Sequence, residues 1–168
     1  DEFANLNIEV VPLSIRFGDD EYTDREQLSV DRFYELLASS DTLPETAAPS
    51  PGRFAESFQR HLDAGATAVV CINISAALSA TMQSAITAAD SMDADIRVVD
   101  STSITVGLGS IVIAAAEAAK NGASADEVVA IAESMSARTH VFGALDTLEN
   151  LQKGGRIGGA QALLGSML

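Results

Sequence analysis

The sequence predicts an α/β fold, with a mostly parallel sheet and helices on both of its faces. Apolar runs rich in β-branched residues alternate with segments of helical periodicity, and short polar loops join them. The run TAVVCINI (residues 67–74) is almost continuously apolar, as in a strand that is covered on both faces. The chain has 168 residues, 47% of them hydrophobic, which is enough for one domain with its own core. We therefore expect a single α/β domain over residues 1–168.

The first third of the chain is expected to contain a strand, a turn and two helices. NIEVVPLSIRF (residues 7–17) is predicted as a strand in which Pro12 favours an edge or a bulge, and FGDDEYTD as the turn after it. Ser29 caps a helix that reaches about residue 38. A loop rich in Pro, Ser and Thr follows over residues 39–52. It ends with Ser50 as N-cap and Pro51 as the first residue of the next helix.

Strands and helices then alternate to the end of the chain. After the strand at 67–74, a helix ends near Met92, and DIRVVD (residues 95–100) is the next strand. A long Ala-rich helix runs to Lys120 and is terminated by Gly122. Ser124 and Glu127 form a capping box that opens a helix to about residue 137, and THVFGALD (residues 139–146) is predicted as the last strand.

Composition excludes several classes of function. The net charge of -14 would repel a phosphate backbone, so nucleic acid is not an expected partner. The longest apolar stretch is too short to cross a bilayer, and we expect a cytoplasmic protein without stable membrane insertion. The single cysteine, Cys71, lies in a predicted strand and is interpreted as a buried, inert thiol. His61 and His140 lack other ligands at metal-binding spacing, so no metal site and no cofactor are predicted.

Hydroxyl side chains gather in three stretches at or beside the predicted strand ends, namely residues 46–50, 75–81 and 101–103. Ligands of parallel sheets bind beyond the carboxyl ends of the strands. Hydroxyl groups and free N–H groups at a helix start are suited to a carboxylate or a phosphate. The alternative is that each hydroxyl only caps its helix, but three such stretches together favour a binding site.

Five sequence blocks resemble, in order and spacing, those of the DegV family of bacterial fatty-acid-binding proteins. They are VVPLSIRFGDDEYTD, PETAAPSPGRF, INISAALSATMQSA, VVDSTSITVGLG and LENLQKGGRIGGAQALLGSML. The resemblance covers nearly the whole chain. It implies a DegV-type N-terminal domain of the EDD fold, similar in architecture to dihydroxyacetone kinase folds. It also implies a lipid carrier without catalytic residues, which holds a long-chain fatty acid and presents its carboxylate to a partner fatty acid kinase.

The resemblance also assigns the carboxylate site. Thr46 matches the family's Thr, and the second ligand residue is Ser79 or Ser75, between which the sequence does not decide. Further contacts to ligand or partner are expected from Thr81, Ser101 and Arg156. Alanine replaces the family's polar residues or glycine at positions 47, 48, 76 and 80, so the loops have lost some hydrogen-bonding capacity.

The resemblance also predicts what precedes and follows this chain in the whole protein. Relatives open with a further strand and continue into a second, C-terminal domain, so we expect the chain to be a fragment that lacks the family's first strand and its C-terminal domain. The residues leave two other functions open. One is a serine-dependent hydrolase or phosphate-handling enzyme, although no G-x-S-x-G elbow surrounds Ser75 or Ser79. The other is a non-catalytic interaction domain.

Overall fold

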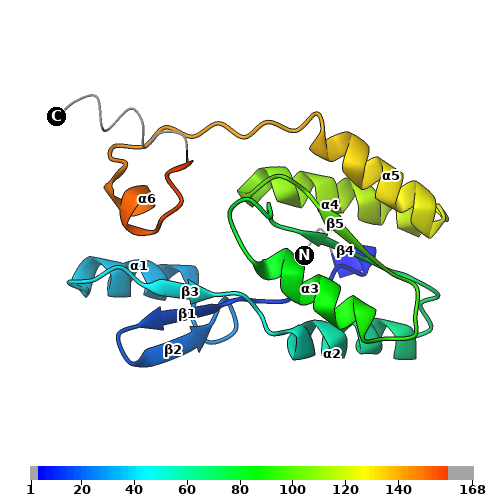
Figure 1. Ribbon diagram of the computed structural model, residues 1–168, viewed down its shortest axis with the longest axis horizontal. Helices are drawn as coiled ribbons and strands as arrows, with labels where there is room; N and C mark the ends of the chain where they lie inside the picture. Colours follow the sequence, from blue (N-terminus) through cyan, green and yellow to red (C-terminus); the bar gives the residue numbers. More distant parts are fainter. Residues whose placement is uncertain (1–3, 159–168) are drawn as a thin grey trace.

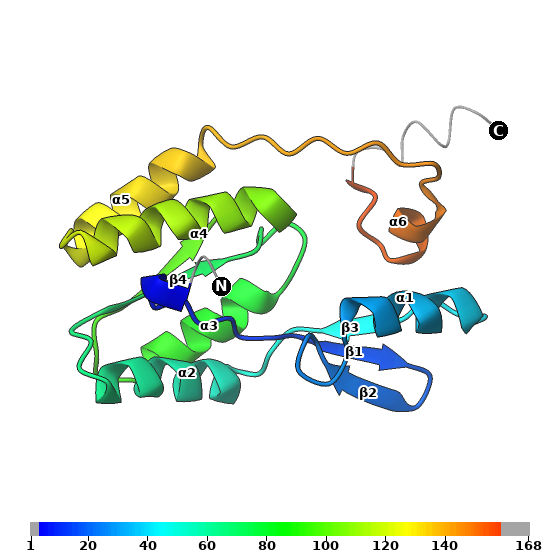
Figure 2. The same cartoon turned by 180° about the vertical axis from the view of Figure 1, so that it is seen from behind.

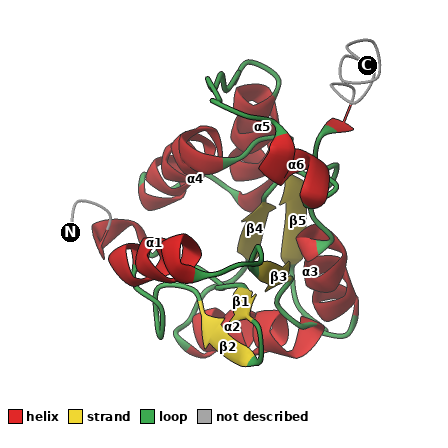
Figure 3. Cartoon of the chain, turned by 90° about the vertical axis from the view of Figure 1, so that its left-hand side faces the viewer, coloured by secondary structure: helices red, strands yellow, loops and turns green. Residues whose placement is uncertain are grey.

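The computed structural model describes residues 4–158 and has a parallel pair of strands at its centre. These strands are β4 (Val69–Asn73) and β5 (Ile96–Asp100), which pair in register from Val69 opposite Ile96 to Asn73 opposite Asp100. Figure 3 shows the pair between α4 and α5 on one side and α2 and α3 on the other. The predicted α/β fold with helices on both faces is therefore confirmed.

The period of two along each strand divides the core between the two faces. Val70, Ile72 and Val99 point to α4 (Thr105–Lys120) and α5 (Ala125–Ser136), where they pack around the fully buried Ile111. The alternate residues face α2 (Pro51–Asp63) and α3 (Thr81–Asp90). Among these residues, Val69, Cys71 and Val98 pack on Phe54 and Phe58. Because helices cover both faces of β4, none of its residues is exposed.

A second, antiparallel sheet lies beside this core and was not predicted (Figures 1 and 2). Its order is β2-β1-β3, from β1 (Ser14–Phe17), β2 (Asp20–Thr23) and β3 (Glu45–Ala47). Gly18 has a φ of 59°, a left-handed conformation that suits the tight turn between β1 and β2. α1 (Val30–Ser39) packs on this sheet through an edge-to-face contact between Phe17 and Phe33, whose ring centroids are 5.7 Å apart.

The predicted helix starts are confirmed. Ser29, Ser50 and Ser124 cap α1, α2 and α5, each accepting a hydrogen bond from the backbone N–H three residues on. The capping box of Ser124 and Glu127 is complete, since Glu127 accepts in return from the backbone N–H of Ser124. Gly122 follows α4 with a φ of 89°, as a residue that ends a helix requires.

Two predicted strands differ from the structure. Only Ser14–Phe17 of the run at 7–17 forms a strand, and Pro12, which has no N–H to donate, precedes it. The predicted strand at 139–146 is wrong within the described residues, because this segment is extended but pairs with no other strand there. It connects α5 to the short helix α6 (Glu149–Lys153), as Figure 1 shows. Among residues 4–158, no helix is long and apolar enough to cross a membrane.

Candidate functional site

One small pocket collects residues from four separate segments of the chain. It has a volume of about 160 Å³ and lies between β3, the start of α3 and the segment after α6. Its lining residues are Leu13, Thr46, Ala47, Ala48, Ser79, Ala80, Thr81 and Arg156. The structure thus brings Thr46, Ser79, Thr81 and Arg156 together, four of the six residues expected from the sequence to contact ligand or partner.

Thr46 is placed by the antiparallel sheet. It lies in β3, within the segment predicted as a loop, and pairs with Ile15 of β1, whose side chain is buried. The side chain of Thr46 is exposed to solvent, so its hydroxyl group is accessible. A residue fixed by strand pairing holds its side-chain direction better than a residue in a loop would.

Ser79 and Thr81 form a hydroxyl pair at the amino end of α3. Their oxygens are 2.8 Å apart, and Ser79 Oγ also accepts from the backbone N–H of Thr81 at 3.3 Å. One hydroxyl hydrogen is used within the pair, which leaves the other free to donate to a ligand. The helix start adds partial positive charge to the same place. Ser79 therefore accepts from the first N–H of α3, and the pair still offers a donor to the pocket.

Ser75 and Ser101 lie elsewhere. Ser75 is 7% exposed, and its carbonyl oxygen accepts from the N–H groups of Leu78 and Ser79, which shapes the turn. Ser101 is fully buried, and its hydroxyl group donates to the carbonyl oxygen of Ser103. Neither is among the residues that line the pocket. Ser79 therefore shares the pocket with Thr46, whereas Ser75 does not line it.

Arg156 contributes positive charge to the pocket of an acidic protein. Its Nε donates to the carbonyl oxygen of Leu78 at 3.5 Å, and its Nη1 to that of Gly154 at 2.7 Å. Within residues 4–158, no carboxylate lies within ion-pair distance of its guanidinium group. The charge is therefore available to an anion in the pocket.

Asp100 positions the turn and was missed by the sequence reasoning. Its Oδ1 accepts from the backbone N–H of Ala76 at 3.2 Å and from that of Thr102 at 2.8 Å. One carboxylate thus ties the loop after β4 to the loop after β5. An acidic residue at the end of a strand, followed by hydroxyl residues, was the available signal in the block VVDSTS.

A larger cavity of about 320 Å³ is lined in part by Leu78. Its lining combines apolar and polar side chains: Leu78, Thr102, Ser103, Ile104, Thr139, His140, Val141 and Phe142. Ser103 Oγ is buried without a hydrogen-bond partner among the described residues. It lies against Gly107, where an added Cβ would overlap both this oxygen and Val141. The larger cavity therefore has four apolar wall residues, one of which, Leu78, precedes Ser79 of the small pocket in the sequence.

The residues that line the small pocket include no cysteine and no histidine or carboxylate that could act as a base. Burial raises the pKa of Cys71 to about 11, so its thiol is protonated at neutral pH. His61 lies 3.2 Å from Glu9, and His140 lines the larger cavity. Neither histidine makes a hydrogen bond to a serine in the part of the chain that the structure describes. Over the same residues, no three His, Cys, Asp or Glu side chains form a group that could hold a metal ion.

Comparison with known proteins identifies relatives along the whole chain. The sequence model of the family described as "Uncharacterised protein, DegV family" matches residues 1–168. A DegV domain-containing protein of Streptococcus pyogenes is 36% identical over 163 residues, which are 97% of this chain and 58% of the relative. The chain therefore spans less than two thirds of the length of this curated relative.

Two solved structures show the same fold. A DegV family protein from Thermus thermophilus, described for its fatty acid binding, superposes with a TM-score of 0.87 at 36% identity, over 99% of this chain and 59% of that protein. DegV from Bacillus subtilis, described as a fatty acid binding protein, has a TM-score of 0.83 at 30% identity, over 99% of this chain and 60% of that protein.

Proposed function

Because the chain belongs to the DegV family, we propose that the whole protein holds a long-chain fatty acid, with its carboxylate in the pocket of Thr46, Ser79, Thr81 and Arg156. The observation that carries this proposal is the convergence of three hydroxyl groups and one arginine on one pocket. The fatty acid binding described for the relatives from Thermus thermophilus and Bacillus subtilis supports it.

The chemistry of the pocket suits a carboxylate. Thr46 and the free hydroxyl hydrogen of the Ser79–Thr81 pair are donors from separate segments of the chain, and a carboxylate has two oxygens that accept. Arg156 offsets the ligand's negative charge, which the net charge of -14 would otherwise oppose. Ser75 and Ser101 act through the shape of the turns and not by direct contact.

The acyl chain has a route out of this pocket. Leu78 lies at the border of the two cavities, because its carbonyl oxygen accepts from Arg156 while Leu78 also lines the larger cavity. Ile104, Val141 and Phe142 provide further apolar wall there. Burying methylene groups against such side chains stabilises the complex by about 0.8 kcal/mol for each CH₂ removed from water.

The proposed role is that of a carrier and not of a catalyst. Hydroxyl groups without a base bind a carboxylate but do not activate it. We propose that a fatty acid kinase in the cytoplasm phosphorylates the bound carboxylate, with Arg156 at the mouth of the pocket facing the incoming phosphate. On this proposal residues 1–168 form one domain, and a second domain of the whole protein covers the rest of the fatty acid.

Titration of the whole protein with a fluorescent fatty acid tests the site. Thr46→Val and Ser79→Ala each remove one hydrogen bond to a charged group, worth about 1.5–3 kcal/mol, so the Kd is expected to rise about 10- to 100-fold. Thr87→Val is the matched control, since this exposed threonine lies on α3 outside the pocket and donates to the carbonyl oxygen of Gln83. Equal affinity of all three variants and the unmodified protein would refute this assignment.

A further inference from the structure

Ser103 carries a buried hydroxyl group that makes no hydrogen bond among the described residues. The residue lies between β5 and α4, is 6% exposed, and belongs to the lining of the larger cavity. Almost all buried hydroxyl groups of native proteins have a hydrogen-bond partner, because an unpaired one has lost its water without compensation. An unpaired hydroxyl group beside a cavity therefore indicates a polar partner that enters with a ligand.

The fold holds the backbone of Ser103 firmly and leaves its side chain unused. Its N–H donates to Ser101 Oγ at 3.1 Å, and its carbonyl oxygen accepts from the backbone N–H of Ser75 at 2.9 Å. A serine just before a helix often caps that helix, but α4 has no hydrogen bond from a side-chain cap. The hydroxyl group is therefore held in a defined place without serving the helix.

The other hydroxyl groups in the lining of the larger cavity already have acceptors. Thr102 donates to the carbonyl oxygen of Ser101 at 2.8 Å, and Thr139 donates to that of Met135 at 2.8 Å. Within residues 4–158, Ser103 is thus the hydroxyl residue of this lining whose side chain has no partner. A polar group that enters the cavity would find its free partner at Ser103.

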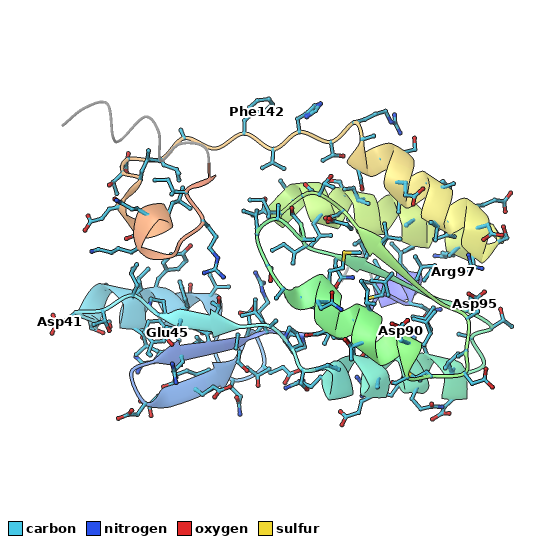
Figure 4. The ribbon with its side chains drawn as sticks, viewed as in Figure 1. Asp41, Glu45, Asp90, Asp95, Arg97 and Phe142 are labelled. Carbon is cyan, nitrogen blue, oxygen red and sulfur yellow. The ribbon has the colours of Figure 1, made fainter. Side chains whose placement is uncertain are left out.

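Val141 lies next to the oxygen of Ser103. A Cβ added at Gly107 would overlap both Ser103 Oγ and Val141 Cγ2, so these two atoms are neighbours. Val141 is 40% exposed, and exposed side chains change rotamer within nanoseconds. The next side chain, Phe142, points away into solvent (Figure 4). Rotation of the Val141 side chain is therefore the movement that exposes Ser103 Oγ to the cavity.

We propose that Ser103 forms a hydrogen bond with a hydroxyl group on the acyl chain, and that the preferred ligand is a hydroxylated fatty acid. This inference rests on the proposed function, in which the acyl chain lies in the larger cavity. A hydroxyl group both donates and accepts, as Ser103 Oγ does, so either group can supply the hydrogen. An unsubstituted acyl chain would cover Ser103 with methylene groups and leave its hydroxyl group unpaired.

Displacement of a fluorescent fatty acid from the whole protein tests this inference. The competitors are stearic acid and hydroxystearic acids that differ only in the position of the hydroxyl group. The best-placed hydroxystearic acid is expected to bind about 3- to 10-fold more tightly than stearic acid, the effect of one neutral hydrogen bond. Ser103→Ala should remove this preference. Urea unfolding of this variant without ligand should show no loss of stability, because no hydrogen bond is removed.

Ser110→Ala is the matched control. Ser110 is an exposed serine of α4 that donates to the carbonyl oxygen of Val106 and lines neither cavity. This variant should keep the full preference for the hydroxystearic acid.

Three other results would overturn the inference. If stearic acid binds and no hydroxystearic acid binds more tightly, Ser103 does not meet a hydroxyl group of the ligand, while the proposed function stands. If Ser103→Ala keeps the preference, or weakens both acids equally and loses stability, Ser103 has a structural role. If neither stearic acid nor any hydroxystearic acid binds, the proposed function fails and this inference fails with it.

Discussion

At the scale of single residues, the site divides into contacts that the sequence suggested and contacts that depend on folding. Thr46, Ser79, Thr81 and Arg156 were expected from family resemblance, and the structure places them in one pocket. Their role in binding stays a prediction. The sequence could not show which of Ser79 and Ser75 lies with Thr46, because only the fold places Ser79 in the pocket lining and leaves Ser75 buried outside it. Leu13 could not be foreseen, because it reaches the pocket through the path of the chain before β1.

Replacing Asp100 tests how the turn at residues 75–81 is held in place. Asp100→Ala removes the acceptor of two backbone N–H groups, those of Ala76 and Thr102. Both residues are exposed, so water can replace the carboxylate in part, and we expect a loss of about 1 kcal/mol in the free energy of unfolding. Fatty acid affinity should fall as well, because the turn at 75–81 is no longer tied.

Asp100→Asn is the control, since its amide oxygen can still accept both hydrogen bonds. Urea unfolding and fatty acid titration of the whole protein measure the two effects. If the Asn and Ala variants lose the same amount in both measurements, the hydrogen bonds of Asp100 do not hold the turn.

At the scale of helices and strands, local signals were sufficient for the helices and insufficient for the strands. Ser29, Ser50 and Ser124 act within one turn of their own helices, so sequence alone located those helix starts. β2 and β3 have four and three residues, and most of their side chains are exposed, so only pairing with β1 makes them strands. The segment at 139–146 shows the converse, since it has strand-like composition without a partner among the described residues.

The capping box of α5 gives a pH-dependent prediction at this scale. Hydrogen bonds from the backbone N–H and then the hydroxyl group of Ser124 lower the pKa of Glu127 from its ordinary value of 4.5. A lowered pKa in the folded protein means that ionised Glu127 stabilises the fold above about pH 4.5, and that this contribution is lost as the pH falls through the folded-state pKa.

Glu127→Gln mimics the protonated side chain and tests the direction of this pH dependence. The variant should be less stable than the unmodified protein at pH 7, and the difference should shrink as the pH falls below 4.5. Urea unfolding at a series of pH values measures it. Asp126→Asn is the control for a charge change in the same helix turn, since the carboxylate of Asp126 pairs with Arg97 of β5 instead, near Asp95 (Figure 4). If the free energy of unfolding of Glu127→Gln differs from that of the unmodified protein by the same amount at every pH, the ionised carboxylate of Glu127 does not stabilise the capping box.

At the scale of the whole molecule, an acidic domain combines a small polar pocket with exposed apolar side chains. Val141 and Phe142 are exposed, and both line the larger cavity. The pocket of Thr46, Ser79, Thr81 and Arg156 holds hydroxyl groups and one guanidinium group without a base. Binding and chemistry are therefore expected to be divided, with this protein holding the ligand and a partner supplying the reaction.

The last prediction is that this protein binds the fatty acid and that a separate kinase carries out the reaction. A carboxylate is a poor electrophile at neutral pH, and its activation requires a phosphoryl donor held by a phosphate-binding loop and Mg²⁺. The sequence of this chain contains no G-x-x-x-x-G-K-[ST] loop. We expect that the purified whole protein, incubated with a fatty acid, ATP and Mg²⁺, forms no acyl phosphate, and that adding a fatty acid kinase starts its formation, as followed by ³¹P NMR.

Variants of the pocket should then separate binding from turnover. Ser79→Ala should slow acyl phosphate formation at low fatty acid concentration and recover at saturation, because it weakens binding of the substrate. Arg156→Ala should stay slow even at saturation, since a guanidinium group beside the carboxylate also stabilises the charge that develops during phosphoryl transfer. Thr87→Val should match the unmodified protein. Acyl phosphate made by the purified protein alone, without any kinase, would contradict the carrier role and make the protein itself the enzyme.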